Sequence, residues 1–144
     1  MDFKVKIALS LAALISVLTA IAHLSCIVLG PACFEAQMAP PALVESATNG
    51  TMLAPVATLI VAGLFIICGV FALSAIGIIK SLPYVRPALL LISVVCLLRG
   101  VATIPLSFMF AEMVSTFNLS AGFTWFITGL LFAYGYYYAF SENT

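Results

Sequence analysis

The chain has 144 residues, of which 65% are apolar and 7% are charged, and its five basic and five acidic residues give a formal net charge of zero. Soluble domains carry about 45–50% apolar and about 25% charged residues, so this composition excludes a water-soluble globular domain and indicates a surface that faces lipid. A net charge of zero offers no basic surface for nucleic acid. The length fits a single domain over residues 1–144.

Four apolar segments are long enough to cross a bilayer as helices. A spanning helix needs about 20 residues, at ~1.5 Å each, to cross a hydrocarbon core of ~30 Å. None of the four segments contains Asp or Glu; they cover residues 6–29, 53–79, 84–110 and 117–140. We therefore predict an all-α fold, an integral membrane four-helix bundle.

The first segment begins with basic residues, as a signal peptide does, but its apolar run exceeds the ~7–15 residues of a signal core. We therefore expect a retained helix. Small residues recur along it at every fourth position: Ala8, Ala12, Ser16 and Ala20. Such a stripe lets another helix approach closely. It is compatible with packing inside the chain, with a homo-oligomer, or with a larger membrane-protein partner.

His23 is the chain's only histidine and lies near the end of the first segment. Its spacing from Thr19 and Ala20 predicts that it points toward the small-residue stripe, so it is a candidate ligand-binding group; the alternative is a buried structural histidine. The sequence has no second histidine and no cluster of His, Cys and Glu on one helix. We therefore expect no metal site and no cofactor.

Two of the four cysteines, Cys26 and Cys33, lie on either side of the Gly30-Pro31 pair. A disulfide between them is feasible if this end of the helix faces an oxidising compartment. A structural role for that bond is favoured over a redox role. Cys68 and Cys96 lie in the middle of spans and are expected to act as small apolar side chains.

The segment 30–52 is the only long connection, and its prolines interrupt regular helix. Part of it, residues 41–48, has the pattern of a short amphipathic helix. Glu35, Glu45 and Glu112 are the acidic residues of the connections expected on the outer side. Glu35 is the preferred counter-charge for a buried cation, because it follows the Gly30-Pro31 break; the alternative is a charge in contact with water.

Arg99 is the most informative residue, because it lies inside the third span and cannot lose its charge. Such an arginine costs roughly 2.5 to 3.5 kcal/mol to insert and marks a candidate functional site. Thr103 lies four residues further and Cys96 three residues earlier, which places all three on adjoining helix positions. We predict an outward-facing polar site formed by Arg99, His23, Thr103 and Glu35. The alternative is that Arg99 is a structural clamp.

The distribution of basic residues predicts the topology. Four of them fall in segments that face the cytoplasm if the N-terminus is inside: Lys4, Lys6, Lys80 and Arg86. The connections 30–52 and 111–116 contain no Lys or Arg, so the positive-inside rule favours both termini in the cytoplasm. We expect a multi-pass protein of the plasma membrane, with a bacterial inner membrane favoured over a eukaryotic one.

Three functions are compatible with these features. The first is an interaction, accessory or lipid-binding subunit, which the small-residue stripe and the shortage of catalytic groups favour. The second is a transporter or binder of a small anionic or amphipathic molecule held at Arg99. The third is an intramembrane enzyme that uses His23, Cys26 or Glu35 at the outer mouth; we favour this least, because no catalytic spacing supports it.

Overall fold

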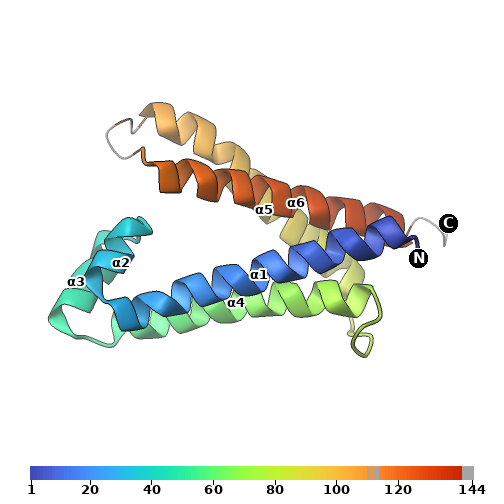
Figure 1. The fold of residues 1–144 in the computed structure, drawn as a ribbon, viewed down its shortest axis with the longest axis horizontal. Coiled ribbons are helices and arrows are strands. Elements are labelled where there is room, and N and C mark those ends of the chain that lie inside the picture. Colours follow the sequence, from blue (N-terminus) through green and yellow to red (C-terminus); the bar gives the residue numbers. More distant parts are fainter. Residues whose placement is uncertain (110, 112–113, 141–144) are drawn as a thin grey trace. The chain divides into compact units, whose positions relative to one another are not determined.

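The structure is a computed structural model that describes residues 1–109, 111 and 114–140 (Figure 1). Its described residues form helices and no strand. Four helices are long and two are short: α1 (Phe3–Leu29), α2 (Pro31–Ala36), α3 (Pro41–Asn49), α4 (Leu53–Ala75), α5 (Val85–Met109) and α6 (Thr116–Phe140). The expected all-α class is confirmed.

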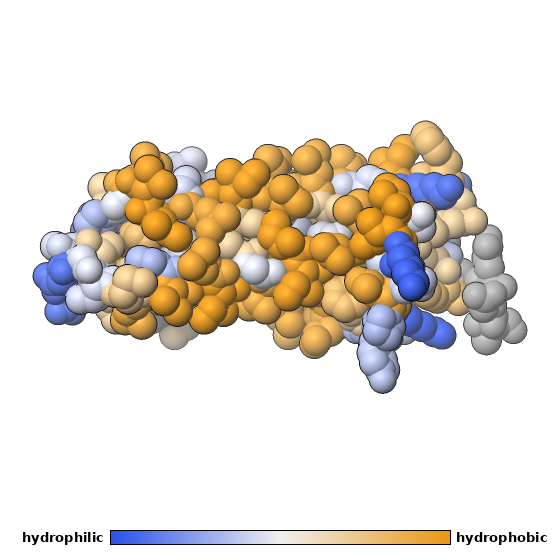
Figure 2. All heavy atoms as spheres, turned by 90° about the horizontal axis from the view of Figure 1, so that it is seen from below, coloured by the Kyte–Doolittle hydropathy of each residue, from blue (hydrophilic) through white to orange (hydrophobic). Residues whose placement is uncertain are grey.

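The helices α1, α4, α5 and α6 are each long and apolar enough to span a membrane. Apolar side chains cover most of the surface seen in Figure 2, and many large ones are more than one-third exposed, for example Leu91 at 66% and Ile104 at 63%. Exposure of these side chains to water would be unfavourable, whereas contact with lipid tails, which are equally apolar, is not. The fold is that of a multi-pass membrane protein.

The chain forms two compact units that share α1 and α4. Unit 1 comprises Met1–Ile15 and Cys68–Thr144, and unit 2 comprises Ser16–Ile67. The single transmembrane domain expected over residues 1–144 stays a prediction, and each unit is described by itself below. The four small residues of the α1 stripe are all buried, with Ala8 and Ala12 in unit 1 and Ser16 and Ala20 in unit 2.

In unit 1, α5 and α6 lie side by side (Figure 1), because glycines allow their backbones to approach. A Cβ atom placed on Gly100 would lie 2.7 Å from the backbone nitrogen of Phe126. The Ser93 hydroxyl donates a hydrogen bond to the Gly129 carbonyl at 3.1 Å, which ties the two helices at a second level. The core of the unit lies around Phe132.

The helix α4 ends at Ala75, four residues before the approximate end of the second span at residue 79. Gly77 adopts a left-handed conformation with φ of 76°. The Gly77 N–H bonds to the Ser74 carbonyl at 3.2 Å, and the Ile78 N–H bonds to the Leu73 carbonyl at 3.1 Å. This is a Schellman motif, which satisfies the last carbonyls of a helix while ending it. Hydropathy alone does not mark this helix end, because Ile76, Ile78 and Ile79 remain apolar.

In unit 2, the connection between α1 and α4 contains the helices α2 and α3. The expected short helix at 41–48 lies where α3 is found, whereas α2 was not expected. A disulfide joins Cys26, near the end of α1, to Cys33 in α2. Cys26, Phe34 of α2 and Ala54 of α4 are buried together, so this connection has its own small core.

We expect Gly100→Ala to lower the free energy of unfolding by about 1–3 kcal/mol, because the new methyl group meets backbone that cannot rotate away. Reversible unfolding in mixed micelles, followed by helical circular dichroism, measures the change. The matched control is Gly63→Ala in α4, where a Cβ would meet nothing within 4 Å. That variant should be neutral or up to ~1 kcal/mol more stable. Equal losses in both variants would contradict the packing described.

The disulfide makes a prediction about thiol counts. Of the four cysteines, only Cys68 and Cys96 are free. Protein denatured without reductant should therefore bind two equivalents of a thiol reagent, and four after reduction. The Cys33→Ser variant should bind three without reductant, and should be on the order of 2 kcal/mol less stable because a short loop is no longer closed. Four reactive thiols in unreduced wild type would exclude the bond.

Candidate functional site

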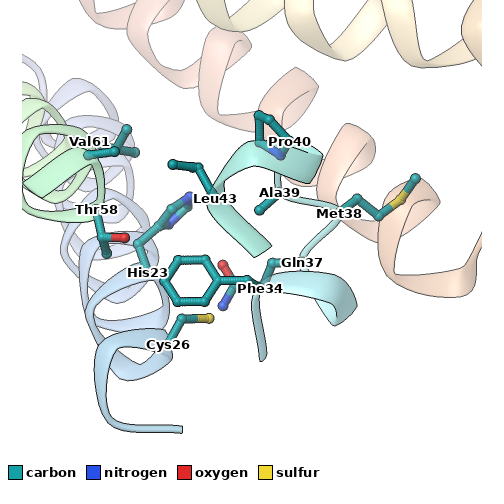
Figure 3. Close-up of a pocket in the computed structure, with 11 residues that line it drawn as sticks. His23, Cys26, Phe34, Gln37, Met38, Ala39, Pro40, Leu43, Thr58 and Val61 are labelled. Carbon is teal, nitrogen blue, oxygen red and sulfur yellow. The ribbon is translucent and has the colours of Figure 1, made fainter. Parts of the chain in front are cut away.

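Unit 2 contains a cavity of about 220 Å³, lined by residues of α1, α2, α3 and α4 and by the turn between α2 and α3 (Figure 3). Its wall is largely apolar, with Phe34, Leu43 and Val61 among the lining side chains. Three polar side chains also line it: His23 of α1, Gln37 after α2, and Thr58 of α4. Among the described residues that line it, none is Asp, Glu, Lys or Arg.

The His23 ring is half-buried and held from two sides. Its Nδ1 lies 2.8 Å from the backbone carbonyl of Thr19, one turn earlier in α1. A carbonyl can only accept, so Nδ1 carries the proton in the neutral ring and Nε2 is left as an acceptor. The ring also packs on Phe65, with ring centroids 5.3 Å apart. Both contacts orient the imidazole, and the hydrogen bond to the Thr19 carbonyl sets the tautomer of the neutral ring.

Gln37 and Thr58 use their hydrogens in a similar way. The Gln37 side-chain amide donates to the Ala22 carbonyl at 2.8 Å and to the Cys33 sulfur at 3.6 Å. The Thr58 hydroxyl donates to the Ala54 carbonyl at 2.7 Å. Sequence reasoning missed both residues as site residues. The available signals were a polar side chain four residues after Cys33 and a hydroxyl among apolar neighbours in the second span.

The disulfide between Cys26 and Cys33 brings the start of α2 against the end of α1. Cys26 itself lines the cavity, and as a disulfide it has no thiol to act as a nucleophile. Glu35 is exposed on α2 and is not among the residues that line the cavity. The bond thus positions Gln37 and Phe34, which follow it in the chain, rather than Glu35.

Arg99 belongs to unit 1 and is exposed on α5. Its Nη1 donates to the Thr103 hydroxyl oxygen at 3.3 Å, and that hydroxyl donates to the Arg99 carbonyl at 3.2 Å. Thr103 is buried and faces α6, since a Cβ on Gly122 would collide with it. The guanidinium is therefore drawn toward the C-terminal end of α5. Cys96 is buried, so it and Thr103 lie inward of Arg99.

The expected four-residue site is divided between the two units. Arg99 and Thr103 are hydrogen-bonded partners in unit 1, whereas His23 and Glu35 belong to unit 2. A joint site of all four residues stays a prediction. The third acidic candidate, Glu112, lies outside the described residues.

No family model, no curated protein and no solved structure matches this chain. The chemistry that bears on its function lies in two polar regions, the cavity in unit 2 and the Arg99–Thr103 pair in unit 1.

Proposed function

We propose that this chain is a lipid-binding accessory protein of the membrane, in which Arg99 holds the anionic headgroup of a lipid. The observation that carries the proposal is an exposed arginine on an apolar face of a membrane-spanning helix. Val95, one turn before Arg99, is 50% exposed, and Leu106, two turns after it, is 41% exposed. Lipid tails that cover these neighbours bring a headgroup within reach of the guanidinium.

The positive charge of Arg99 requires an anionic hydrogen-bond acceptor, and the membrane-spanning helices contain no carboxylate that could serve as one. A guanidinium has five N–H donors and stays protonated in proteins. Thr103 accepts one of these donors. None of α1, α4, α5 and α6 contains Asp or Glu. A phosphate group can take two guanidinium donors side by side, so an anionic lipid headgroup satisfies both the charge and the geometry.

The depth of Arg99 suits this role. At ~1.5 Å per residue, Arg99 lies about 21 Å from Val85 and about 15 Å from Met109 along α5. The whole helix is about 38 Å long and exceeds a hydrocarbon core of ~30 Å. Its C-terminal end therefore extends into the headgroup region. The hydrogen bond to Thr103 directs the side chain toward that end, which is the direction in which an arginine at membrane depth reaches for polar surroundings.

A binder or transporter of a small free anion is the alternative use of the same donors. Both readings need an anionic oxygen at Arg99, and they differ in the mass and the origin of the bound molecule. Larger membrane-protein partners and a homo-oligomer remain part of the proposal, because an accessory protein acts through such contacts.

We expect native mass spectrometry of the protein in lipid particles, extracted without detergent, to show an adduct with the mass of an anionic phospholipid. In Arg99→Gln, which keeps polarity but removes the charge, the adduct should fall roughly tenfold or more, since hydrogen bonds to charged groups are the strong ones. Arg99→Lys should retain part of it, because a lysine binds phosphate as a point charge.

The matched control is Arg86→Gln, which removes the other charge of α5. Arg86 lies over the rings of Tyr136 and Phe140, 5.8 Å from each centroid, and is exposed at the start of the helix. Its loss should leave the adduct in place. An adduct that survives Arg99→Gln would overturn the lipid site, and a small-anion mass in place of a lipid mass would establish the alternative.

We propose further that both termini face the cytoplasm of a plasma membrane, with a bacterial inner membrane favoured. Four basic residues, Lys4, Lys6, Lys80 and Arg86, lie on the proposed inner side, while residues 30–52 and 111–116 contain none. The tyrosines near the end of α6, with Arg86 stacked on one of them, form the kind of aromatic group that favours a membrane interface.

Two single-cysteine additions test this orientation. Thr48 in α3 and Ser81 after α4 are both exposed. In intact cells, a membrane-impermeant maleimide should label Thr48→Cys and should label Ser81→Cys only after the membrane is permeabilised. Unmodified wild type provides the background from the native cysteines. The opposite pattern of labelling would reverse the topology.

A further inference from the structure

We infer that the cavity in unit 2 is a second binding site, for a small uncharged molecule with an apolar body and at least one hydroxyl or N–H donor. The inference is independent of the lipid site proposed at Arg99. It rests on how His23, Gln37 and Thr58, the polar residues of the cavity wall, use their own hydrogens.

Each of these side chains donates to the chain itself. His23 gives its Nδ1 hydrogen to Thr19, Gln37 gives its amide hydrogens to Ala22 and Cys33, and the Thr58 hydroxyl gives its hydrogen to Ala54. What each residue retains is acceptor capacity: the imidazole Nε2, the amide Oε1 and the lone pairs of the hydroxyl oxygen.

A cavity whose polar side chains offer only acceptors favours a ligand that is uncharged and that carries hydrogen-bond donors. A ligand hydroxyl or N–H can be accepted at any of these atoms, and each such bond replaces one that the ligand made with water. An anion would bring further lone pairs toward these acceptors, and none of the described lining residues is Lys or Arg. A cation would be desolvated without a carboxylate to pair with it, because none of the lining residues that the structure describes is acidic.

The size and the lining limit the ligand to a single ring or a short chain. The cavity volume is about 220 Å³, and an apolar cavity of about 150 Å³ is large enough for a benzene-sized molecule. Phe34, Leu43 and Val61 supply apolar contact. A mostly apolar cavity with a few orienting polar groups is the usual form of a small-molecule site.

The specificity can be tested with ligands that differ in one group. We propose ¹⁹F NMR titrations of 4-fluorophenol, 4-fluorotoluene and 4-fluorobenzoate against the protein in lipid nanodiscs, with protein-free discs as the blank. The first two have nearly the same shape and differ in the donor, whereas the third carries a negative charge. We expect saturable binding of 4-fluorophenol, roughly tenfold tighter than that of 4-fluorotoluene, and no saturable binding of 4-fluorobenzoate.

Variants locate the binding in the cavity. Val61→Trp should fill the cavity and abolish 4-fluorophenol binding, whereas Val56→Trp, the same substitution at an exposed position of α4 that does not line the cavity, should leave it unchanged. His23→Phe and Thr58→Val keep the approximate shape and remove one acceptor each. They should weaken 4-fluorophenol binding several-fold and leave 4-fluorotoluene binding as it was.

The wild-type comparison decides the inference even if a variant misfolds, and the thiol count of each variant checks that the disulfide has formed. Equal affinity for 4-fluorophenol and 4-fluorotoluene would overturn the donor selectivity. If 4-fluorobenzoate bound more tightly than 4-fluorophenol, the inference that the wall offers only acceptors would be overturned. Signals that do not saturate above the lipid blank, or binding that persists in Val61→Trp, would show that the cavity is not the site. Loss of the Arg99 lipid adduct has no bearing on these outcomes.

Discussion

Hydrogen-bond donors inside a bilayer must find their acceptors within the protein, because hydrocarbon offers none. The spans of this chain follow that constraint closely. The hydroxyls of Thr58 and Thr128 donate to the carbonyl four residues earlier in their own helices, both at 2.7 Å. Ser107 does the same at 2.6 Å. At the end of α4, the Schellman motif provides donors for the last carbonyls. The helices, the cap of α4 and the hydroxyl side chains thus all satisfy the requirement that donors and acceptors be paired within the protein.

The two polar regions differ in how they meet this requirement. In unit 2, the donors of the cavity wall are already satisfied by the backbone, so the wall is left with acceptors. In unit 1, Arg99 has more donors than Thr103 can take. The two regions are therefore chemically complementary to different molecules, one that supplies hydrogens and one that supplies anionic oxygen. A chain with a net charge of zero can in this way present both kinds of site without a charged surface.

Packing in unit 1 determines which of these side chains stay accessible. Gly100 sits against the backbone of Phe126, and Gly122 sits against Thr103. These close approaches fix the rotation of α5 about its own axis, with Thr103 turned inward. Arg99 is one position before Gly100 in the helix, about 100° around the axis, and so lies beside the contact rather than in it.

Hydropathy was sufficient to predict the four spans, because an apolar run of helical length has few other uses. It does not locate the end of α4 to the residue, because Ile78 and Ile79 stay apolar after Gly77 has already turned the chain. The spacing of Arg99 and Thr103 was enough to predict that they would be neighbours, since residues four apart meet on a helix. For Gln37 the spacing from Cys33 was not sufficient, because its place in the cavity depends on α2, a helix of six residues whose position is set by the disulfide and by packing.

The disulfide has a consequence for the order in which the protein matures. In the proposed topology, Cys26 and Cys33 can be oxidised only after the segment between α1 and α4 has reached the outer side of the membrane. The wall of the cavity includes Cys26 and depends on α2 being tied to α1. Insertion of the long helices can therefore be complete before the cavity is formed. The last step of maturation is then the formation of the disulfide on the oxidising side of the membrane.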